Sequence, residues 1–309
     1  MIDMKGKNLL SLHDLCHEEV LQVLKTAQDL KLRQQIGERP LLLERKTVAM
    51  IFQKPSLRTR VSFETGITQL GGHAIYLGPD DISLGTRESV EDIAQVLSRY
   101  IDLIMARVFG HDIVADLARY ATVPVINGLS DLTHPCQALG DLLTIQEKKL
   151  RMRGLKLAFI GDGNNVANSL LYAGAKVGMH VSVASPEGYE LRDDVLAQAR
   201  EDALATGAQM HVTHDPLEAV QDADIVYTDV WASMGQEAEA EARKALFQPF
   251  QVNMELFKHA KADAVFMHCL PAHYGEEVTD EVARSPHSVI YDQAENRMHA
   301  QNALMALVL

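Results

Sequence analysis

Short apolar runs alternate with amphipathic helical segments along most of this chain. In the first half, the apolar runs lie at residues 47–52, 74–77, 103–107 and 123–127. In the second half, they lie at residues 156–160, 180–184, 209–213, 225–228, 265–268 and 289–292. Alternation of strands with crossover helices predicts parallel sheets that are covered by helices.

The helical segments and the chain length predict the domain organisation. Helical periodicity is found at residues 17–35, 58–70, 135–148 and 295–309, and a further helix begins at Ser89. A chain of 309 residues exceeds the length at which one hydrophobic core usually divides, and the basic stretch 148–154 is the expected boundary. We therefore expect an α/β protein with two doubly wound parallel-sheet domains, residues 1–148 and 149–294, and a cleft between them. The C-terminal helix, 295–309, is expected to cross back to the first domain.

Composition limits the classes of partner. Apolar residues make up 47% and charged residues 23% of the sequence, as in ordinary soluble proteins, and the formal net charge is −13. This charge argues against nucleic acid or an anionic membrane as the partner. Residues 1–10 do not resemble a signal peptide, and no apolar run approaches the ~20 residues of a membrane helix. Because Cys16, Cys136 and Cys269 are too scattered for a disulfide framework, a cytoplasmic location is expected.

The segment Ser-Leu-Arg-Thr-Arg at residues 56–60 is the strongest candidate for a binding site. It opens a helix and is separated from the preceding apolar run by Lys54-Pro55. Free backbone N–H groups and the helix dipole favour an anion at this position. Arginine adds paired donors that match phosphate oxygens. The segment therefore predicts a phosphate-bearing ligand, and the alternative is an ordinary N-cap followed by surface arginines.

Other polar groups follow the carboxyl ends of predicted strands, where parallel sheets bind ligands. Arg107 ends an apolar run, and a charge in that position is either paired or functional. Asp229 offers a carboxylate to an ammonium group, with Ser233 on the same turn, and the alternative is an Asp-capped loop. The segment His-Cys-Leu-Pro at residues 268–271 brings a thiol and backbone carbonyls to a strand end.

The segment Gly-Asp-Gly-Asn-Asn at residues 161–165 lies between a predicted strand and a predicted helix, so a dinucleotide site has to be considered. Val166 replaces the third glycine of the fingerprint, and the next strand ends at Ser185 without the acid that would hold a ribose. A nicotinamide cofactor is therefore disfavoured. Asn164 and Asn165 would point amide donors into the cleft, and Asn165 would serve a substrate carboxylate.

A metal site is the other alternative that the residues leave open. Zinc could be bound by His134, Cys136, His268 and Cys269, but neither pair has the usual ligand spacing. His134 stands beside a helix start, where a lone histidine is more often structural. We expect no metal ion and no organic cofactor.

Taken together, these segments resemble the aspartate/ornithine transcarbamoylase family, and most closely its members that use ornithine. The matching segments occur in the family's order at residues 56–60, 105–107, 134–137, 229–235 and 268–271. The resemblance implies that the first domain binds carbamoyl phosphate and that the second binds L-ornithine. It also implies a homotrimer or an assembly of trimers.

The resemblance further implies a role for individual residues. Carbamoyl phosphate would be bound by Ser56, Leu57, Arg58, Thr59, Ser83, Arg107, His134, Gln137, Cys269, Leu270 and Arg297. Ornithine would be bound by Asn165, Asp229, Ser233 and Met234. Catalysis would depend on Thr59, Arg107, His134 and Cys269. Leu57 replaces a threonine that is frequent in the family, Ser83 would reach a neighbouring subunit's site, and Ala272 replaces an arginine found in some members.

The implied reaction agrees with the chemistry of these groups. Attack of an amine on the carbamoyl carbon builds negative charge on the carbonyl oxygen, which Thr59, Arg107 and His134 would stabilise. Asp229 and Asn165 fit the α-ammonium and the carboxylate of ornithine. Putrescine lacks the carboxylate, N-acetylornithine lacks the α-ammonium, and aspartate would require further cationic groups. A transcarbamoylase for another amine and a catalytically inactive binding subunit remain as alternatives, and motifs do not encode the direction of the reaction in the cell.

Overall fold

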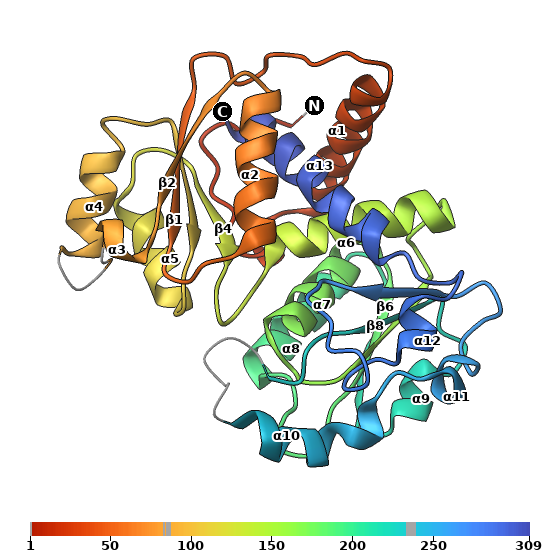
Figure 1. Ribbon diagram of the computed structural model, residues 1–309. Helices are drawn as coiled ribbons and strands as arrows, with labels where there is room; N and C mark the ends of the chain where they lie inside the picture. The colour runs from red at the N-terminus through yellow and green to blue at the C-terminus, as the bar shows by residue number, and fades with distance from the viewer. Residues whose placement is uncertain (1, 83, 85–87, 233–238) are drawn as a thin grey trace. The chain divides into compact units, whose positions relative to one another are not determined.

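The computed structural model describes residues 2–82, 84, 88–232 and 239–309 (Figure 1). The chain divides into two compact units, of which the first comprises Met1–Leu143 with Glu295–Leu309 and the second comprises Thr144–Ala294. Each unit contains a parallel sheet flanked by helices, which confirms the predicted fold class. Across the described ranges, no helix combines the length and the apolar character that a membrane span requires.

The sheet of the first unit has the strand order β2-β1-β3-β4, and all neighbouring strands are parallel. Its strands are β1 (Thr47–Phe52), β2 (His73–Leu77), β3 (Leu103–Arg107) and β4 (Val125–Leu129). Its helices are α1 (His17–Gln35), α2 (Leu57–Gln69), α3 (Pro79–Ile82), α4 (Val90–Leu97) and α5 (His111–Tyr120), with a 3₁₀ turn, η1 (Leu12–Asp14). Strand β4 begins two residues later than predicted, after Pro124, which has no N–H to donate to a sheet.

The two faces of the first sheet are covered by different helices. Alternate residues of β1 and β3, such as Ile51 and Ile104, pack against α4 and α5, which contribute Ile93 and Leu117 to the same core. Figure 1 shows α2 on the opposite side of this sheet, together with α13 (Ile290–Val308). The strand ends that carry the candidate site therefore lie at an edge of a sheet that is fixed from both faces.

The C-terminal helix α13 packs on the first unit, as predicted. Gly6 donates its N–H to the carbonyl of Val308 at 2.9 Å, and Lys31 donates to the Oδ1 of Asn296 at 2.7 Å. Gly66 of α2 lies so close to α13 that an added Cβ would stand 2.0 Å from the Oδ1 of Asn302. These contacts place the helix against the N-terminal segment, α1 and α2.

The predicted strand at residues 289–292 is wrong, because α13 begins at Ile290. Extended pairing is limited to an isolated bridge between Phe266 and Ser288 and to a hydrogen bond from the N–H of Val289 to the carbonyl of Phe266. A short apolar run fits a buried helix start as well as a strand, and periodicity alone does not separate the two.

The sheet of the second unit has the strand order β7-β6-β5-β8-β9 and is also parallel. Its strands are β5 (Lys156–Ile160), β6 (His180–Ala184), β7 (Met210–Thr213), β8 (Ile225–Thr228) and β9 (Val265–His268). Its helices are α7 (Asn165–Val177), α8 (Asp193–Ala203), α9 (Pro216–Val220), α10 (Ala240–Phe247), α11 (Met254–Phe257) and α12 (Asp280–Ala283), with a 3₁₀ turn, η3 (Gln248–Phe250). Helix α6 (Pro135–Lys149) begins in the first unit and ends in the second.

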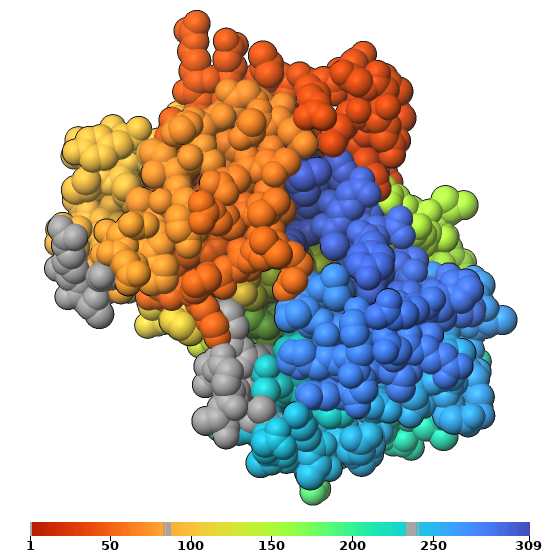
Figure 2. All heavy atoms as spheres, in the orientation of Figure 1, coloured from red at the N-terminus to blue at the C-terminus, as the bar shows by residue number. Residues whose placement is uncertain are grey.

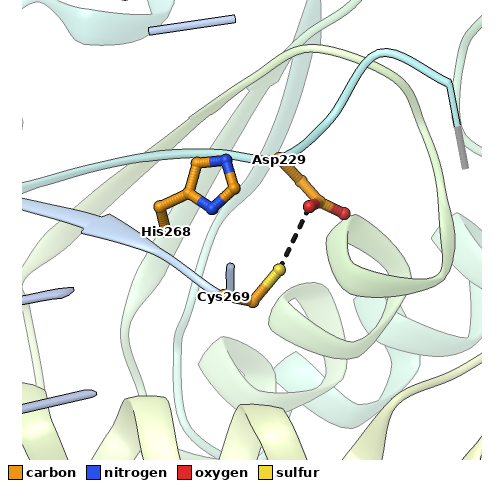
Figure 3. A group of neighbouring side chains, drawn as sticks. All are labelled: Asp229, His268 and Cys269. Carbon is orange, nitrogen blue, oxygen red and sulfur yellow. Dashed lines mark hydrogen bonds between the residues drawn. The ribbon is translucent and has the colours of Figure 1, made fainter. Parts of the chain in front are cut away.

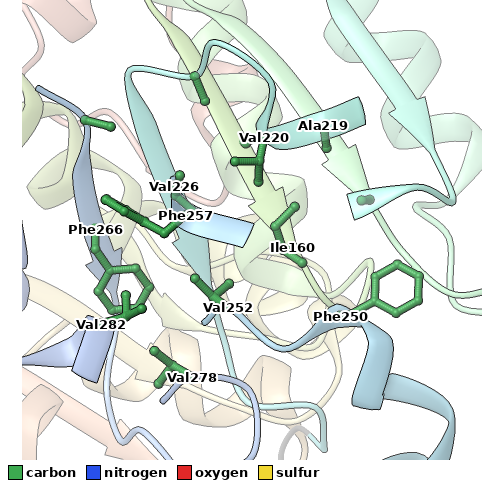
Figure 4. Close-up of a cluster of buried hydrophobic side chains, with 14 of the residues drawn as sticks. Ile160, Ala219, Val220, Val226, Phe250, Val252, Phe257, Phe266, Val278 and Val282 are labelled. Atoms are coloured by element: carbon green, nitrogen blue, oxygen red, sulfur yellow. The ribbon is translucent and has the colours of Figure 1, made fainter. Parts of the chain in front are cut away.

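The core of the second unit holds three neighbouring strand ends together. Ile160 of β5, Val226 of β8 and Phe266 of β9 pack with Val220 of α9 and Phe257 of α11 (Figure 4). Because these strands are parallel and adjacent, the residues that follow β5, β8 and β9 emerge at the same edge of the sheet.

Candidate functional site

Two groups of candidate residues are present, one in each unit. The first-unit cluster consists of Ser56, Arg58, Thr59, Arg107, His134, Gln137 and Arg297. The second-unit cluster consists of Asn164, Asn165, Asp229, Cys269 and Leu270.

The first-unit cluster starts at the N-terminus of α2. Ser56 is the N-cap residue, and its Oγ accepts from the backbone N–H of Thr59. The same Oγ lies 3.1 Å from the Oγ1 of Thr59. The side chain of Leu57 is 76% exposed, so this position contributes its backbone. The guanidinium of Arg60 packs on an aromatic ring, with its Cζ 3.8 Å from the ring centre of Tyr76. Arg60 is therefore engaged by Tyr76, whereas the charge of Arg58 acts on His134.

Arg107 ends β3 directly beside this helix start. In the sheet it is opposite Phe52, the last residue of β1, and a register irregularity separates it from Ala106 on the β4 side. Its Nη1 donates to the Oγ1 of Thr59 at 3.0 Å. The strand end and the helix N-terminus thus bring a guanidinium and a hydroxyl group together, as the sequence predicts for an anion site.

His134 lies buried just before α6, in a turn that is fixed by Asn127. The Nδ2 of Asn127 donates to the carbonyl of Leu10 at 2.9 Å and to the Oγ1 of Thr133 at 3.0 Å. Sequence reasoning did not select Asn127, because its effect depends on partners far apart in the chain. The turn before His134 is therefore held both by β4 and by the N-terminal segment.

Burial lowers the pKa of His134 well below its ordinary value, and the charges of Arg297, Arg107 and Arg58 lower this pKa further. The imidazole is therefore neutral at neutral pH, and it can act as a hydrogen-bond donor without carrying charge. The arginines affect it because they converge on the same place from α2, β3 and α13.

Gln137 and Arg297 complete the first-unit cluster. The Nη1 of Arg297 donates to the Oε1 of Gln137 at 3.1 Å, and the Nε2 of Gln137 donates to the Oδ1 of Asp141 at 2.8 Å. Sequence reasoning missed Asp141, although its position four residues after Gln137 on one helix was an available signal.

The second-unit cluster starts where α7 follows β5. Asn164 caps this helix, because its Oδ1 accepts from the backbone N–H groups of Val166 and Ala167 at 2.9 and 3.1 Å. Its Nδ2 donates to the Oδ2 of Asp229 at 2.9 Å. Asn165 is the first residue of α7. Asn164 therefore positions Asp229, a role that the sequence did not indicate.

Asp229 is buried directly after β8 and faces Cys269, which directly follows β9 (Figure 3). The thiol of Cys269 donates to the Oδ1 of Asp229 at 3.1 Å. With Asn164 on Oδ2, both carboxylate oxygens are oriented by a donor. The negative charge of Asp229 is therefore held in a fixed direction at the edge of the sheet.

His268 shapes the turn that carries Cys269 and Leu270. Its Nε2 lies 3.1 Å from the Oε1 of the buried Glu277, and its Nδ1 accepts from the N–H of Leu270 at 2.9 Å. Leu270 has a positive φ of 60° and precedes a cis peptide bond to Pro271. A leucine in this conformation requires support, and the buried imidazole provides it.

Asp229, His268 and Cys269 offer atoms within 4.8 Å of one another that could ligate a metal ion. Both nitrogens of His268 already face Glu277 or Leu270, however, so the imidazole is occupied by structural contacts. Cys136, a first-unit member of the zinc set considered from the sequence, is also a poor ligand. Burial raises the pKa of its thiol to about 12, which opposes the thiolate that zinc requires.

Arg243 of α10 holds two segments that flank the second-unit cluster. Its Nη1 donates to the Oδ2 of Asp162 and to the carbonyl of Trp231, both at 2.9 Å. Burial raises the pKa of Asp162, and the guanidinium of Arg243 opposes this rise. Arg243 thus joins the turn before α7 to the segment that follows Asp229. The predicted residues Ser83, Ser233 and Met234 lie outside the described residues.

Comparisons with known proteins match both halves of the chain to one family. Residues 7–147 match the family model for the carbamoyl-P binding domain of aspartate/ornithine carbamoyltransferase, and residues 153–308 match the model for its Asp/Orn binding domain. The chain is 59% identical over 309 residues to the ornithine carbamoyltransferase of Thermococcus kodakarensis, covering 100% of this chain and 98% of that protein.

Solved structures are similar over the whole chain. The structure of ornithine carbamoyltransferase from Pyrococcus furiosus has a TM-score of 0.97 at 59% identity and covers 100% of this chain and 98% of its own. The enzyme from Thermus thermophilus has a TM-score of 0.87 at 45% identity, with 97% and 98% covered. The chain therefore belongs to the aspartate/ornithine carbamoyltransferase family.

Proposed function

We propose that this protein transfers the carbamoyl group of carbamoyl phosphate to the δ-amine of L-ornithine and releases L-citrulline and phosphate. The observation that carries the proposal is the convergence of Arg58, Arg107 and Arg297 on the neutral, buried His134. Such a set of donors suits a substrate that has both an anionic phosphate and a polar carbonyl group. The names of the relatives, which include an anabolic ornithine carbamoyltransferase from Pyrococcus furiosus, support it.

In the first unit, the phosphate is held at the N-terminus of α2. Ser56, Arg58 and Thr59 contribute side chains, and Leu57 contributes its backbone N–H. The exposed side chain of Leu57 supports this assignment, because a side chain that points to solvent leaves the backbone N–H as the group that contacts the phosphate. Arg107 reaches both the phosphate and the carbamoyl oxygen, and its contact with Thr59 preorganises the two donors.

The carbamoyl group is held by the remaining residues of the first-unit cluster. Thr59, Arg107 and His134 donate to the carbonyl oxygen, where negative charge develops as the amine attacks. A neutral His134 suits this role, because a neutral imidazole still carries one N–H that can donate a hydrogen bond to the carbamoyl oxygen. Gln137 accepts from the carbamoyl NH₂ group, and Arg297 completes the site.

In the second unit, Asp229 binds the α-ammonium group of ornithine and Asn165 binds its carboxylate. The bonds from Asn164 and Cys269 support this, since they fix the direction of the Asp229 carboxylate. Ser233 and Met234 are assigned to the same amino-acid site. The carbonyl of Leu270 and the thiol of Cys269 are assigned to the neighbourhood of the attacking amine.

The chemical step transfers one acyl group between two nucleophiles. The neutral δ-nitrogen forms a bond to the carbamoyl carbon, and the bond from that carbon to the phosphate oxygen breaks with its electron pair. The amine loses one proton, and the departing phosphate accepts it, so no dedicated side-chain base is required. The reaction needs no metal ion and no organic cofactor.

We further propose a homotrimer, or an assembly of trimers, in the cytoplasm. Exposed apolar side chains on the first unit support association, because Leu57 and Val61 of α2 and Ile75 of β2 are 76%, 50% and 38% exposed. In the space-filling view, the orange atoms of α2 lie at the surface of this unit (Figure 2). Strand β2 is also an edge strand of its sheet. Sedimentation equilibrium would test the assembly.

An assay of phosphate and ureido product tests the reaction, with carbamoyl phosphate and four amines: ornithine, N-acetylornithine, putrescine and aspartate. We expect turnover with ornithine alone. Turnover with another amine would keep the carbamoyl transfer and overturn the assignment of Asp229 and Asn165. Folded protein that is inactive with all four would favour a binding subunit.

A further inference from the structure

We infer that Asp141 is a positioning residue that fixes the side-chain amide of Gln137 in one orientation. Through this amide, the site selects an acyl phosphate that has an NH₂ group on its acyl carbon. The inference rests on the proposed function and adds a determinant of substrate specificity to it. Asp141 is fully buried on α6, four residues after Gln137, and the reaction as proposed assigns it no role.

The contacts form a continuous chain from Asp141 to Arg297. The Oδ1 of Asp141 accepts from the Nε2 of Gln137 at 2.8 Å, and the Oε1 of Gln137 accepts from the Nη1 of Arg297 at 3.1 Å. The three residues are 0%, 2% and 4% exposed. Water therefore has little access to compensate for a misplaced amide.

The chemistry of the two flanking groups determines which end of the amide is which. A guanidinium group can only donate hydrogen bonds, and an ionised carboxylate can only accept them. A rotation of the amide by 180° would place NH₂ against Arg297 and an oxygen against Asp141, so both bonds would be lost in a buried place. The orientation of Gln137 is therefore fixed by its partners.

Close packing of α13 against α6 keeps this arrangement in register. Gly140 lies beside Asp141, and a Cβ at this position would be 2.7 Å from the Cα and 2.9 Å from the backbone nitrogen of Arg297. The missing side chain therefore lets the backbone of Arg297 approach α6 within one turn of Gln137. The position of the guanidinium depends on this approach.

The fixed amide has a consequence for the substrate. Its oxygen has a second lone pair after accepting from Arg297, so Gln137 offers an acceptor to the acyl group. The NH₂ of carbamoyl phosphate can donate to this acceptor. The methyl group of acetyl phosphate has a similar size and cannot. A buried site built for a hydrogen bond strongly rejects an analogue that lacks the partner.

The experiment compares these two acyl phosphates in the full-length protein. The selectivity ratio is the competitive inhibition constant of acetyl phosphate divided by the KM of carbamoyl phosphate. We expect this ratio to be at least ~10 in the wild type and to fall by about tenfold in Asp141→Asn and Asp141→Leu. Asparagine can pair with either end of the Gln137 amide, so that Arg297 alone then opposes the rotation, and leucine removes the acceptor. The KM of ornithine is expected to stay unchanged.

A control separates selectivity from loss of stability. Asp102 is a partly buried carboxylate of the same unit that accepts from the N–H of Thr47 at 2.8 Å and pairs with Lys46 at 2.9 Å. Asp102→Asn is expected to lower thermal stability and to leave the selectivity ratio unchanged. A merely structural role for Asp141 would give the same result as this control.

Two outcomes overturn the inference and a third concerns the proposed function. An unchanged ratio in either folded Asp141 variant shows that the carboxylate does not set the selectivity. If neither variant folds, the wild type decides, and a ratio near 1 rejects the inference. If the wild type does not turn over carbamoyl phosphate, the proposed function fails. Calorimetric titration of the same proteins with each acyl phosphate then measures the ratio without catalysis.

Discussion

The two clusters differ in the sign of their charge and in how they are built. The first-unit cluster surrounds a neutral imidazole with guanidinium groups that arrive from α2, β3 and α13 on long side chains. The second-unit cluster surrounds one carboxylate, Asp229, with short donors that directly follow strand ends or cap a helix. A chain with a net charge of −13 can therefore still build a cationic site, because several arginines that converge on one place outweigh the overall charge there.

The first test removes a cation from the first-unit cluster and has the largest expected effect. Arg107→Ala should lower kcat by ~10²–10³, because the developing charge on the carbamoyl oxygen loses a preorganised donor. Steady-state kinetics of folded protein measures this. Arg119→Ala, an exposed arginine near the end of α5, serves as the control and should retain normal turnover. Near-normal turnover of Arg107→Ala would refute its catalytic role.

The second test removes the anion from the second-unit cluster. Asp229→Asn should raise the KM of ornithine by about 30-fold or more, because a buried charge pair is worth at least ~2 kcal/mol. The KM of carbamoyl phosphate should not change. Asp194→Asn, an exposed carboxylate of the same unit, is the matched control. An equal rise in both KM values would mean that the two clusters do not divide the substrates between them.

The difference between the clusters also explains what the sequence could predict. Arg107 and Asp229 each follow an apolar strand, and Ser56 follows a strand and caps a helix, so local pattern was sufficient to select them. The parallel pairing follows from the same alternation of elements, whereas the order of the strands in each sheet is known only from the structure. Arg297 was selected by resemblance alone, because nothing in its helical surroundings marks it as a ligand of the first unit.

The residues that sequence reasoning missed act through a partner. Asp141 was not selected from the sequence, and Asn164 was expected only to point its amide into the cleft. The contacts that give both residues their roles depend on which atom of an amide faces which neighbour. The spacing of four residues could have paired Asp141 with Gln137, but it does not indicate which atom of the amide faces the carboxylate. The wrong strand at residues 289–292 has a different cause, since a short apolar run before a long helix satisfies either pattern until its partners are known.

A pair of glycine substitutions, one in each unit, tests whether the two clusters can be disturbed separately. A Cβ at Gly140 would meet the backbone of Arg297 at 2.7 Å, and a Cβ at Gly163 would meet the backbone of Glu190 at 2.4 Å. Each substitution to alanine should cost about 1–3 kcal/mol, because the neighbouring backbone has to move.

The two glycine variants should affect different substrates. Gly140→Ala should raise the KM of carbamoyl phosphate, since Arg297 is displaced. Gly163→Ala should raise the KM of ornithine, since the turn that carries Asn164 and Asn165 is displaced. Thermal unfolding and both KM values, measured side by side, check this. If both variants lose stability but neither raises the KM of its own substrate selectively, then neither close approach positions a substrate.

The smallest expected effect concerns pH and is confined to the first-unit cluster. His134 has a folded-state pKa well below its ordinary value of 6.5, first because it is buried and then because of Arg297, Arg107 and Arg58. Below pH 6.5 the unfolded chain therefore binds a proton that the folded chain does not. The free energy of unfolding should fall with decreasing pH in this range, by at most about 1.4 kcal/mol per pH unit. His134→Gln should remove this part of the slope between pH 6.5 and 5, and His211→Gln, at an exposed histidine of the second unit, should not. Denaturant titrations at several pH values measure the difference. Equal slopes for the wild type and His134→Gln would contradict a buried, neutral imidazole, and with it the electrostatic contrast between the two clusters.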